Sequence, residues 1–194
     1  MKQLRADLRL IYDWIPSGSH VLDLGCGDAS LLATLTEQKA VTGYGIELDS
    51  SALLAAMATG ANVIQSDLEE GLQTFGDNSF DVVVLSQTIQ AMRNTEDILL
   101  DMLRVGKEAI VTFPNFGYWR NRLQILKGQM PVSESMPYEW YNTPNIHWCM
   151  VRDFDALCRK NGIKILERTV MSGGRRIDFW PNLMGSLAFY RVGR

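Results

Sequence analysis

Residues 21–28 read Val-Leu-Asp-Leu-Gly-Cys-Gly-Asp, an apolar run that ends in the pattern Asp-x-Gly-x-Gly. The run predicts a buried strand. Gly25 and Gly27 let the backbone after it turn sharply and approach a ligand where a Cβ atom would collide. A helix predicted from about Asp28 to Lys39 then points its unpaired N–H groups at that ligand. A strand, a glycine turn and a helix in this order predict a nucleotide pocket.

The composition fits one soluble domain with a sizeable core. The chain has 194 residues, of which 46% are hydrophobic, and a net charge of −3. An acidic chain lacks the basic footprint of nucleic-acid binding, and its cations at Arg120, Arg122, Lys127, Arg175 and Arg176 are typical of a solvated face. We therefore expect a single domain over residues 1–194 that does not bind nucleic acid.

The cysteine pattern and the N-terminal sequence allow a prediction of the cellular compartment of the protein. Cys26, Cys149 and Cys158 make an odd number without a Cys-x-x-Cys spacing, which argues against a disulfide framework and a structural zinc site. Residues 1–15 place apolar side chains on one face of a helix between charges, unlike a signal peptide, and no apolar run approaches membrane-spanning length. These patterns predict a cytoplasmic protein without a membrane segment.

Strand and helix patterns alternate along the chain. Strands are expected at residues 20–24, 41–47, 62–67, 80–86, 109–113, 163–171 and 187–191. Helices are expected at residues 1–15 and 28–39, from a cap at Ser50 or Ser51 to about Gly60, from Thr95 to Gly106, and at about residues 153–161. This order predicts a doubly wound, Rossmann-like α/β fold with a mostly parallel seven-stranded sheet and helices on both faces.

One segment, at about residues 114–150, breaks the alternation. It contains Pro131, Pro137 and Pro144 and several Trp and Tyr residues, and beyond about residues 118–126 it has little periodicity. Long loops in compact domains are usually functional, and the aromatic content argues against disorder. Our hypothesis is that this insertion is a lid, a partner-docking surface, or both.

Polar residues end the predicted strands at the edge where ligands of open α/β sheets bind. Glu47 follows the glycines by about 20 residues, where an acid can accept both ribose hydroxyls. Asp67 can accept from the exocyclic amine of adenine, and Asp23 can orient the glycine turn or hold an amino group. The expected cofactor-binding residues are Asp23, Gly25, Cys26, Gly27, Glu47, Leu48, Asp67, Leu68, Ser86 and Gln87.

Two adenosine cofactors compete for this pocket. NAD requires a third glycine where Ser30 stands, and Asp28 places a negative charge beside the expected pyrophosphate position. S-adenosylmethionine has no phosphate and carries a sulfonium and an amino group, which the acids attract. The charges favour S-adenosylmethionine or its product S-adenosylhomocysteine, with a dinucleotide or an ordinary structural turn as the alternatives.

Residues from about 20 to 113 resemble class I S-adenosylmethionine-dependent methyltransferases, with the family's motifs in order at residues 21–27, 44–49, 65–67 and 78–86. The whole chain is similar more narrowly to the MetW family of methionine biosynthesis proteins. The strings that carry this likeness are residues 21–28, residues 43–47, Leu-Ser-Gln-Thr-Ile-Gln at 85–90 and Phe-Pro-Asn-Phe-Gly-Tyr-Trp at 113–119. A third glycine usual in the first motif is Ala29 here, a mild departure.

The resemblance implies a methyltransferase fold that acts in methionine synthesis alongside a homoserine O-acyltransferase, without naming a methylated substrate. The alternative is a free-standing methyltransferase acting on a small metabolite, with Gln87, Gln90, Tyr118 and His147 near the acceptor. His147 and Cys149 lack a third metal ligand at a suitable spacing, so no metal is expected. No residue is assigned a catalytic role, because methyl transfer depends on orientation more than on acid or base groups.

Overall fold

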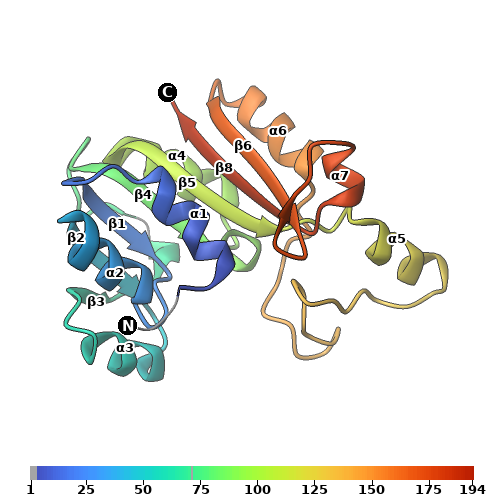
Figure 1. Ribbon diagram of the computed structural model, residues 1–194, viewed down its shortest axis with the longest axis horizontal. Helices are drawn as coiled ribbons and strands as arrows, with labels where there is room; N and C mark the ends of the chain where they lie inside the picture. The colour runs from blue at the N-terminus through green and yellow to red at the C-terminus, as the bar shows by residue number, and fades with distance from the viewer. Residues whose placement is uncertain (1–3, 71) are drawn as a thin grey trace.

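The computed structural model describes residues 4–70 and 72–194, and an eight-stranded sheet runs through this part of the chain in the order β3-β2-β1-β4-β5-β8-β6-β7 (Figure 1). The strands are β1 (His20–Leu24), β2 (Thr42–Glu47), β3 (Val63–Gln65), β4 (Phe80–Ser86), β5 (Gly106–Pro114), β6 (Lys164–Ser172), β7 (Arg175–Arg176) and β8 (Leu187–Gly193). The helices are α1 (Ala6–Trp14), α2 (Ser30–Lys39), α3 (Ser50–Met57), α4 (Thr95–Val105), α5 (Trp119–Leu126), α6 (Val151–Lys160) and α7 (Pro181–Met184), with 3₁₀ turns η1 (Leu68–Glu70) and η2 (Ile89–Ala91).

The first five strands are parallel, whereas β8 runs antiparallel to both β5 and β6. The predicted α/β class is therefore confirmed, but the predicted number of seven strands is wrong. A turn at Gly173 and Gly174 lets Arg175 and Arg176 pair with the end of β6 as the short strand β7. Two residues are too few for a period-2 pattern to reveal a strand.

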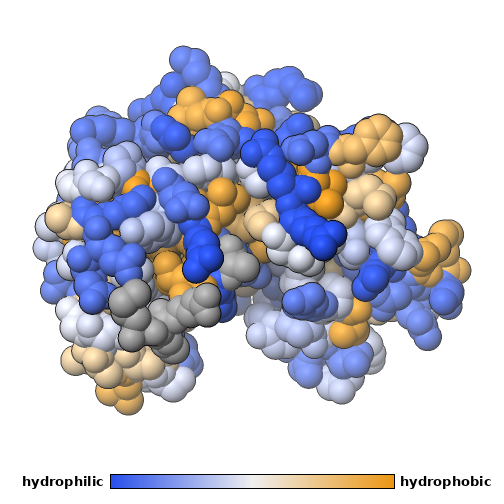
Figure 2. All heavy atoms as spheres, viewed as in Figure 1, coloured by the Kyte–Doolittle hydropathy of each residue, from blue (hydrophilic) through white to orange (hydrophobic). Residues whose placement is uncertain are grey.

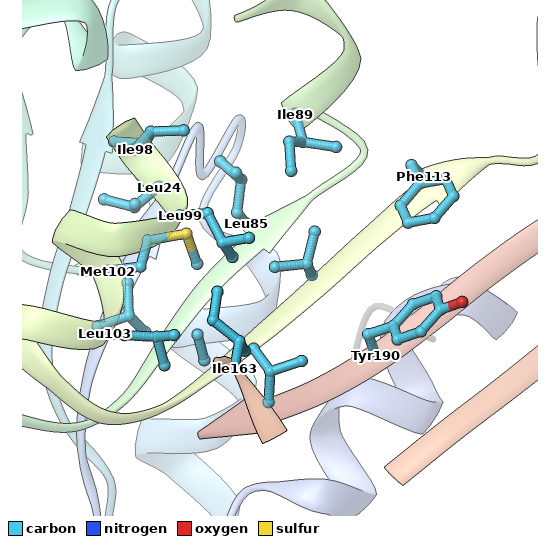
Figure 3. Close-up of a cluster of buried hydrophobic side chains, with 14 of the residues drawn as sticks. Leu24, Leu85, Ile89, Ile98, Leu99, Met102, Leu103, Phe113, Ile163 and Tyr190 are labelled. Carbon is cyan, nitrogen blue, oxygen red and sulfur yellow. The ribbon is translucent and has the colours of Figure 1, made fainter. Parts of the chain in front are cut away.

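Helices cover both faces of the sheet, and β4 shows why. Val82 and Val84 pack with α1 and α2 on one face, while Val83 and Leu85 pack with α4 and α6 on the other. Figure 3 shows Leu85 among side chains of α4 in this second cluster. A strand buried on both faces is apolar throughout rather than alternating, as residues 82–85 are.

The order of the strands places a ligand site between β1 and β4. The chain adds β2 and β3 on one side of β1 and then crosses to β4 on the other side. At such a reversal the loops after the two central strands diverge and leave a crevice at their carboxyl ends. The glycine turn after β1 lies at this crevice.

Two helix starts differ from the prediction. Helix α2 begins at Ser30 rather than Asp28, because Ala29 has a left-handed φ of 52° and prolongs the turn. Helix α3 is capped by Asp49, not by Ser50 or Ser51: the Asp49 carboxylate accepts a hydrogen bond from the Ala52 N–H (2.8 Å). Within the described residues, no helix is both long and apolar enough to cross a membrane.

The insertion leaves the sheet after β5 and returns to α6. It contains α5 and then an irregular segment, and Figure 1 shows both projecting at the end of the molecule away from α2 and α3. The N–H of Phe116 donates to the carbonyl of Cys149 (2.9 Å), so the two ends of the insertion meet at its base.

Candidate cofactor site

A cavity of about 1110 Å³ opens at the carboxyl ends of β1 and β4. The turn after β1 lines it on one side and residues 86–88 after β4 on the other, while Leu4, Arg5 and Leu8 contribute from the N-terminal segment. The lining continues along α2 to residues 59–62 after α3. Its place and size are those of a small-molecule site in an open α/β sheet.

Asp23 is the buried acid among the charged residues that line this cavity, which also include Arg5, Asp28 and Glu37. Asp23 is the penultimate residue of β1, only 3% of it is exposed, and none of the described residues donates a hydrogen bond to its carboxylate. Burial and the nearby Glu47 raise the pKa of Asp23 to about 7. A buried carboxylate without a donor suits a ligand that supplies a positive charge or an N–H group.

The glycine turn is fixed by its backbone. The N–H groups of Gly25 and Cys26 both donate to the carbonyl of Ile46 (2.8 and 3.0 Å). Gly25 has a φ of +66°, and a Cβ atom there would lie 2.8 Å from the Thr88 hydroxyl oxygen, so steric crowding as well as conformation requires glycine. The turn is therefore held in one shape at the mouth of the cavity.

Glu47 ties this turn to the end of β2. One carboxylate oxygen accepts from the Gly27 N–H (2.8 Å), and the other accepts from the N–H groups of Leu48 and Asp49 (2.9 and 3.0 Å). The side chain thus orients two loops at neighbouring strand ends. Its additional role toward a ribose stays a prediction.

Six of the ten expected binding residues line the cavity: Asp23, Gly25, Cys26, Gly27, Ser86 and Gln87. The other four lie outside this lining: Glu47 ends β2, Leu48 follows it, and Asp67 and Leu68 follow β3. Asp67 accepts a hydrogen bond from the Glu69 N–H (2.9 Å) at the start of η1. Their assignment as cofactor ligands remains a prediction.

The chemistry of Cys26 is that of a neutral thiol. Burial, Asp23 and Glu47 raise its pKa to about 12, so it remains protonated at neutral pH. A neutral thiol is a poor nucleophile and a poor metal ligand. Among the described residues, no group of three His, Cys, Asp or Glu side chains is placed to hold a metal ion.

Gln87 connects the cavity to α1 and to the insertion. It has a left-handed φ of 52°, and its side-chain amide donates to the Asp7 carboxylate of α1 (2.6 Å). Its carbonyl accepts from the Gln90 side chain (2.6 Å), and the Gln90 carbonyl accepts from the N–H groups of Ile146 and His147 (2.8 and 2.9 Å). The contribution of Asp7 was not predicted, because no spacing in the sequence relates it to residue 87.

Of the residues considered for a methyl acceptor, Gln87 lines the cavity, and Gln90, Tyr118 and His147 do not. The Tyr118 hydroxyl lies 3.4 Å from the Ser172 hydroxyl, and the His147 ring nitrogen Nε2 lies 3.3 Å from the Arg93 carbonyl. These side chains therefore lie along the insertion and its contacts rather than around the cavity.

A family model described as "Methionine biosynthesis protein MetW" matches residues 5–192. The chain belongs to the MetW family. It is 36% identical over 208 aligned residues to the "Bifunctional methionine biosynthesis protein MetXA/MetW" of Rhodopirellula baltica. That match covers 98% of this chain and 33% of the relative, so the chain spans about a third of the relative's length.

Solved methyltransferase structures share the fold of this MetW-family chain. An S-adenosylmethionine-dependent methyltransferase from Mesorhizobium loti is similar with a TM-score of 0.73 and 14% identity, over 98% of both chains. One from Listeria monocytogenes, described as putative, has a TM-score of 0.71 and 16% identity over 96% of this chain and 97% of its own. One from Thermotoga maritima has a TM-score of 0.70 and 17% identity over 97% of this chain and 87% of its own. The Rossmann-like methyltransferase fold is therefore confirmed.

Proposed function

We propose that this chain binds S-adenosylmethionine or S-adenosylhomocysteine in the cavity between β1 and β4. The observation that carries the proposal is Asp23, a buried carboxylate at the cavity that receives no hydrogen bond from the described residues. The cofactor brings an ammonium group, which would provide donors and charge for Asp23. The fold of the solved neighbours, which are described as S-adenosylmethionine-dependent methyltransferases, supports the same ligand.

The residues of the site have separate roles in this proposal. The glycine turn approaches the ligand with its backbone, Glu47 accepts from the ribose, and Asp67 accepts from the adenine amine. When bound, S-adenosylmethionine supplies a methyl group activated on a sulfonium. The acids Asp23 and Asp28, which line the cavity, would repel the pyrophosphate of NAD at the same place.

Titration calorimetry with S-adenosylhomocysteine, and separately with NAD, tests the ligand. We expect saturable heat for one S-adenosylhomocysteine per chain and none for NAD. Asp23→Asn should weaken S-adenosylhomocysteine binding at least tenfold, which corresponds to about 1.4 kcal/mol. Asp97→Asn, an exposed carboxylate on α4, is the matched control and should bind like the wild type. Binding of NAD with no response to S-adenosylhomocysteine would contradict the proposal.

We propose further that the chain supports a homoserine O-acyltransferase in methionine synthesis, in the cytoplasm. Membership of the MetW family supports the pathway. The name of the Rhodopirellula baltica relative joins a MetXA part to a MetW part in one chain, which supports a physical association. Two parts in one polypeptide meet at high effective concentration, and separate chains need a binding surface to achieve the same result.

The acyl-transfer rate of the homoserine O-acyltransferase from the same organism, titrated with this protein, tests the role. A change in rate that saturates near one chain per acyltransferase subunit is expected, and repeating it with S-adenosylmethionine measures the influence of the cofactor. An unchanged rate together with no co-elution would overturn the role.

The second candidate is a methyltransferase that acts alone on a small metabolite. The cavity of about 1110 Å³ favours it, because this volume slightly exceeds the range of about 300–1,000 Å³ usual for small-molecule sites and leaves room beside a cofactor. Transfer of a labelled methyl group from S-adenosylmethionine to a low-molecular-weight fraction would establish this activity. That outcome, with no effect on acyl transfer, would replace the supporting role.

A further inference from the structure

The base of the insertion is rigidly built. Asn115 is fully buried, and its side-chain amide donates to the carbonyls of Asn182 (3.1 Å) and Gly185 (2.8 Å) around α7. Its side-chain oxygen accepts from the N–H groups of Gly117 (3.1 Å) and Val151 (3.4 Å). One side chain thereby joins β5, α6 and α7 at the point where the insertion leaves the sheet.

The outer part of the insertion is also ordered by its own contacts. The Gln124 side chain on α5 donates to the Val132 carbonyl (3.1 Å) and accepts from the Val132 N–H (3.0 Å). Ser133 and Met136 form a β-bridge. The returning end is fixed by the Gln90 carbonyl, which accepts from Ile146 and His147. A segment held at its base, middle and end presents its surface with little entropy left to lose.

The insertion does not cover the cofactor cavity. None of the residues that line the cavity belongs to residues 114–150. Figure 1 shows α5 and the segment after it at the opposite end of the molecule from α2 and α3. This placement favours docking over a lid as the role of the exposed surface.

That surface is rich in exposed aromatic side chains. We define the aromatic face of the insertion as Met130, Tyr138, Trp140, Tyr141 and Trp148, all exposed, with Trp140 at 71% and Tyr141 at 70%. Met130, Tyr138, Trp140 and Trp148 line one shallow hollow, and the rings of Trp140 and Tyr141 meet edge to face with centroids 5.8 Å apart. The five side chains thus form one continuous surface.

Exposed apolar residues also occur on α5, at the start of the insertion. Leu123, Ile125 and Leu126 of α5 are exposed, and Figure 2 shows hydrophobic residues on the surface at this end of the molecule. Contiguous exposed apolar surface on an ordered segment marks a site of protein association. Trp, Tyr and Met are the residue types enriched in protein interfaces, where Trp and Tyr most often dominate the binding energy.

We propose that the aromatic face of the insertion is the docking site for the homoserine O-acyltransferase. The inference rests on the proposed function for the identity of the partner. The relative that combines MetXA and MetW in one chain favours an acyltransferase over a second copy of this chain as the occupant. Because the face lies away from the cavity, one chain can hold the cofactor and the acyltransferase together.

The test compares two variants with equal numbers of truncated exposed apolar side chains. The first is the double variant Trp140→Ala/Tyr141→Ala. The control is Leu54→Ala/Met57→Ala on α3, where both side chains are exposed. Binding of the purified acyltransferase from the same organism is measured by calorimetry. The aromatic double variant should raise the Kd at least 100-fold and the control less than threefold, with S-adenosylhomocysteine affinity and unfolding temperature unchanged in both.

The outcomes distinguish this inference from the proposed function. If the wild type and the aromatic double variant bind the acyltransferase equally, the docking site is elsewhere, and the proposed partnership stands. If the wild type does not bind the acyltransferase at all, the partnership fails and the docking inference fails with it. If sedimentation shows a wild-type dimer that the double variant abolishes while acyltransferase binding is unaffected, the occupant is a second copy and the inference is overturned.

Discussion

The chain leaves the carboxyl edge of the parallel strands by a tight turn after β1 and by a long insertion after β5. In the turn, backbone N–H groups from Gly25, Cys26 and Gly27 are all bonded, and the side chains nearby are small or acidic. In the insertion, a buried Asn115 holds the base while Trp140 and Tyr141 remain exposed. The same edge of one sheet therefore carries two surfaces of different chemistry.

The difference separates recognition by a few fixed polar groups from recognition by broad apolar contact. A small cationic ligand is bound through a few fixed polar groups in a cavity, and any added atom in the turn would interfere with it. A protein partner is bound through broad apolar contact, which several large aromatic rings supply. If this comparison is right, a substitution that disrupts one region should leave the binding properties of the other unchanged.

The largest effect is expected from Gly43→Ala, which disrupts the pairing of β1 with β2 next to the glycine turn. A Cβ atom at residue 43 would overlap the backbone carbonyl oxygen of Val21, so β1 and β2 must separate. We expect a loss of at least about 4 kcal/mol in unfolding free energy, measured by denaturant titration. Gly128→Ala in the insertion meets no atom within 4 Å and should cost only about 1 kcal/mol, from its φ of +77°. Equal losses would refute the contrast in steric tolerance.

The next effect comes from the titration of Asp23. In the folded chain the pKa of the Asp23 carboxyl is about 7, whereas its ordinary value is 3.8. Between these values the folded state binds more protons than the unfolded state, so stability falls as the pH rises. The side chain of Asp23→Asn does not titrate, so the stability of this variant relative to the wild type should rise with pH by about 1.4 kcal/mol per unit. The rise should level off above pH 7, after a total of at most about 4 kcal/mol.

Denaturant titrations of both proteins at pH 4, 5, 6, 7 and 8 measure this difference, with Asp97→Asn as the control that should follow the wild type. Saturating S-adenosylhomocysteine should reduce the slope, because its ammonium group stabilises the Asp23 carboxylate. A pH-independent difference would mean that Asp23 is already ionised in the folded chain.

A smaller loss is expected from Asn115→Ala at the base of the insertion. The change leaves the carbonyls of Asn182 and Gly185 without their donor, and we expect a loss of about 2–3 kcal/mol. Limited proteolysis should then cut within residues 127–148 faster, while S-adenosylhomocysteine affinity changes less than twofold. Asn142→Ala is the control and should resist proteolysis like the wild type, because Asn142 is exposed and its side-chain oxygen accepts from the Glu139 N–H (2.9 Å) within the insertion itself. A large loss of cofactor affinity in Asn115→Ala would show that the two regions are not independent.

The smallest effect is a gain in stability from Ala40→Gly. Ala40 follows α2 with a left-handed φ of 51° and lies outside the cavity lining. Glycine removes the strain of a Cβ atom in this conformation, so the unfolding free energy should rise by about 1 kcal/mol with unchanged cofactor affinity. Ala58→Gly, which follows α3 with a φ of −65°, should not stabilise the chain. If both changes had the same effect, the strain at Ala40 would be negligible.

Sequence patterns predicted the elements whose residues are dictated locally. The unbroken apolar run in β4 predicted a strand buried on both faces, and the spacing of Ile98, Leu99, Met102 and Leu103 predicted the buried face of α4. The Asp-x-Gly-x-Gly pattern predicted the turn after β1, where both glycines have positive φ values. Patterns failed at boundaries: the left-handed Ala29 delays α2, and the two-residue β7 has no periodicity.

The sequence by itself determined the alternating order of strands and helices, the glycine turn and the acids at the strand ends, because each depends on residues close together in the chain. Only the tertiary structure decided that Asp23 is buried with no donor among the described residues, that Gln87 reaches Asp7 of α1, and that the insertion does not line the cavity. These facts depend on contacts between distant segments. A pattern records which faces a segment must bury, whereas desolvation, pKa and exposure are set by what the rest of the fold places against it.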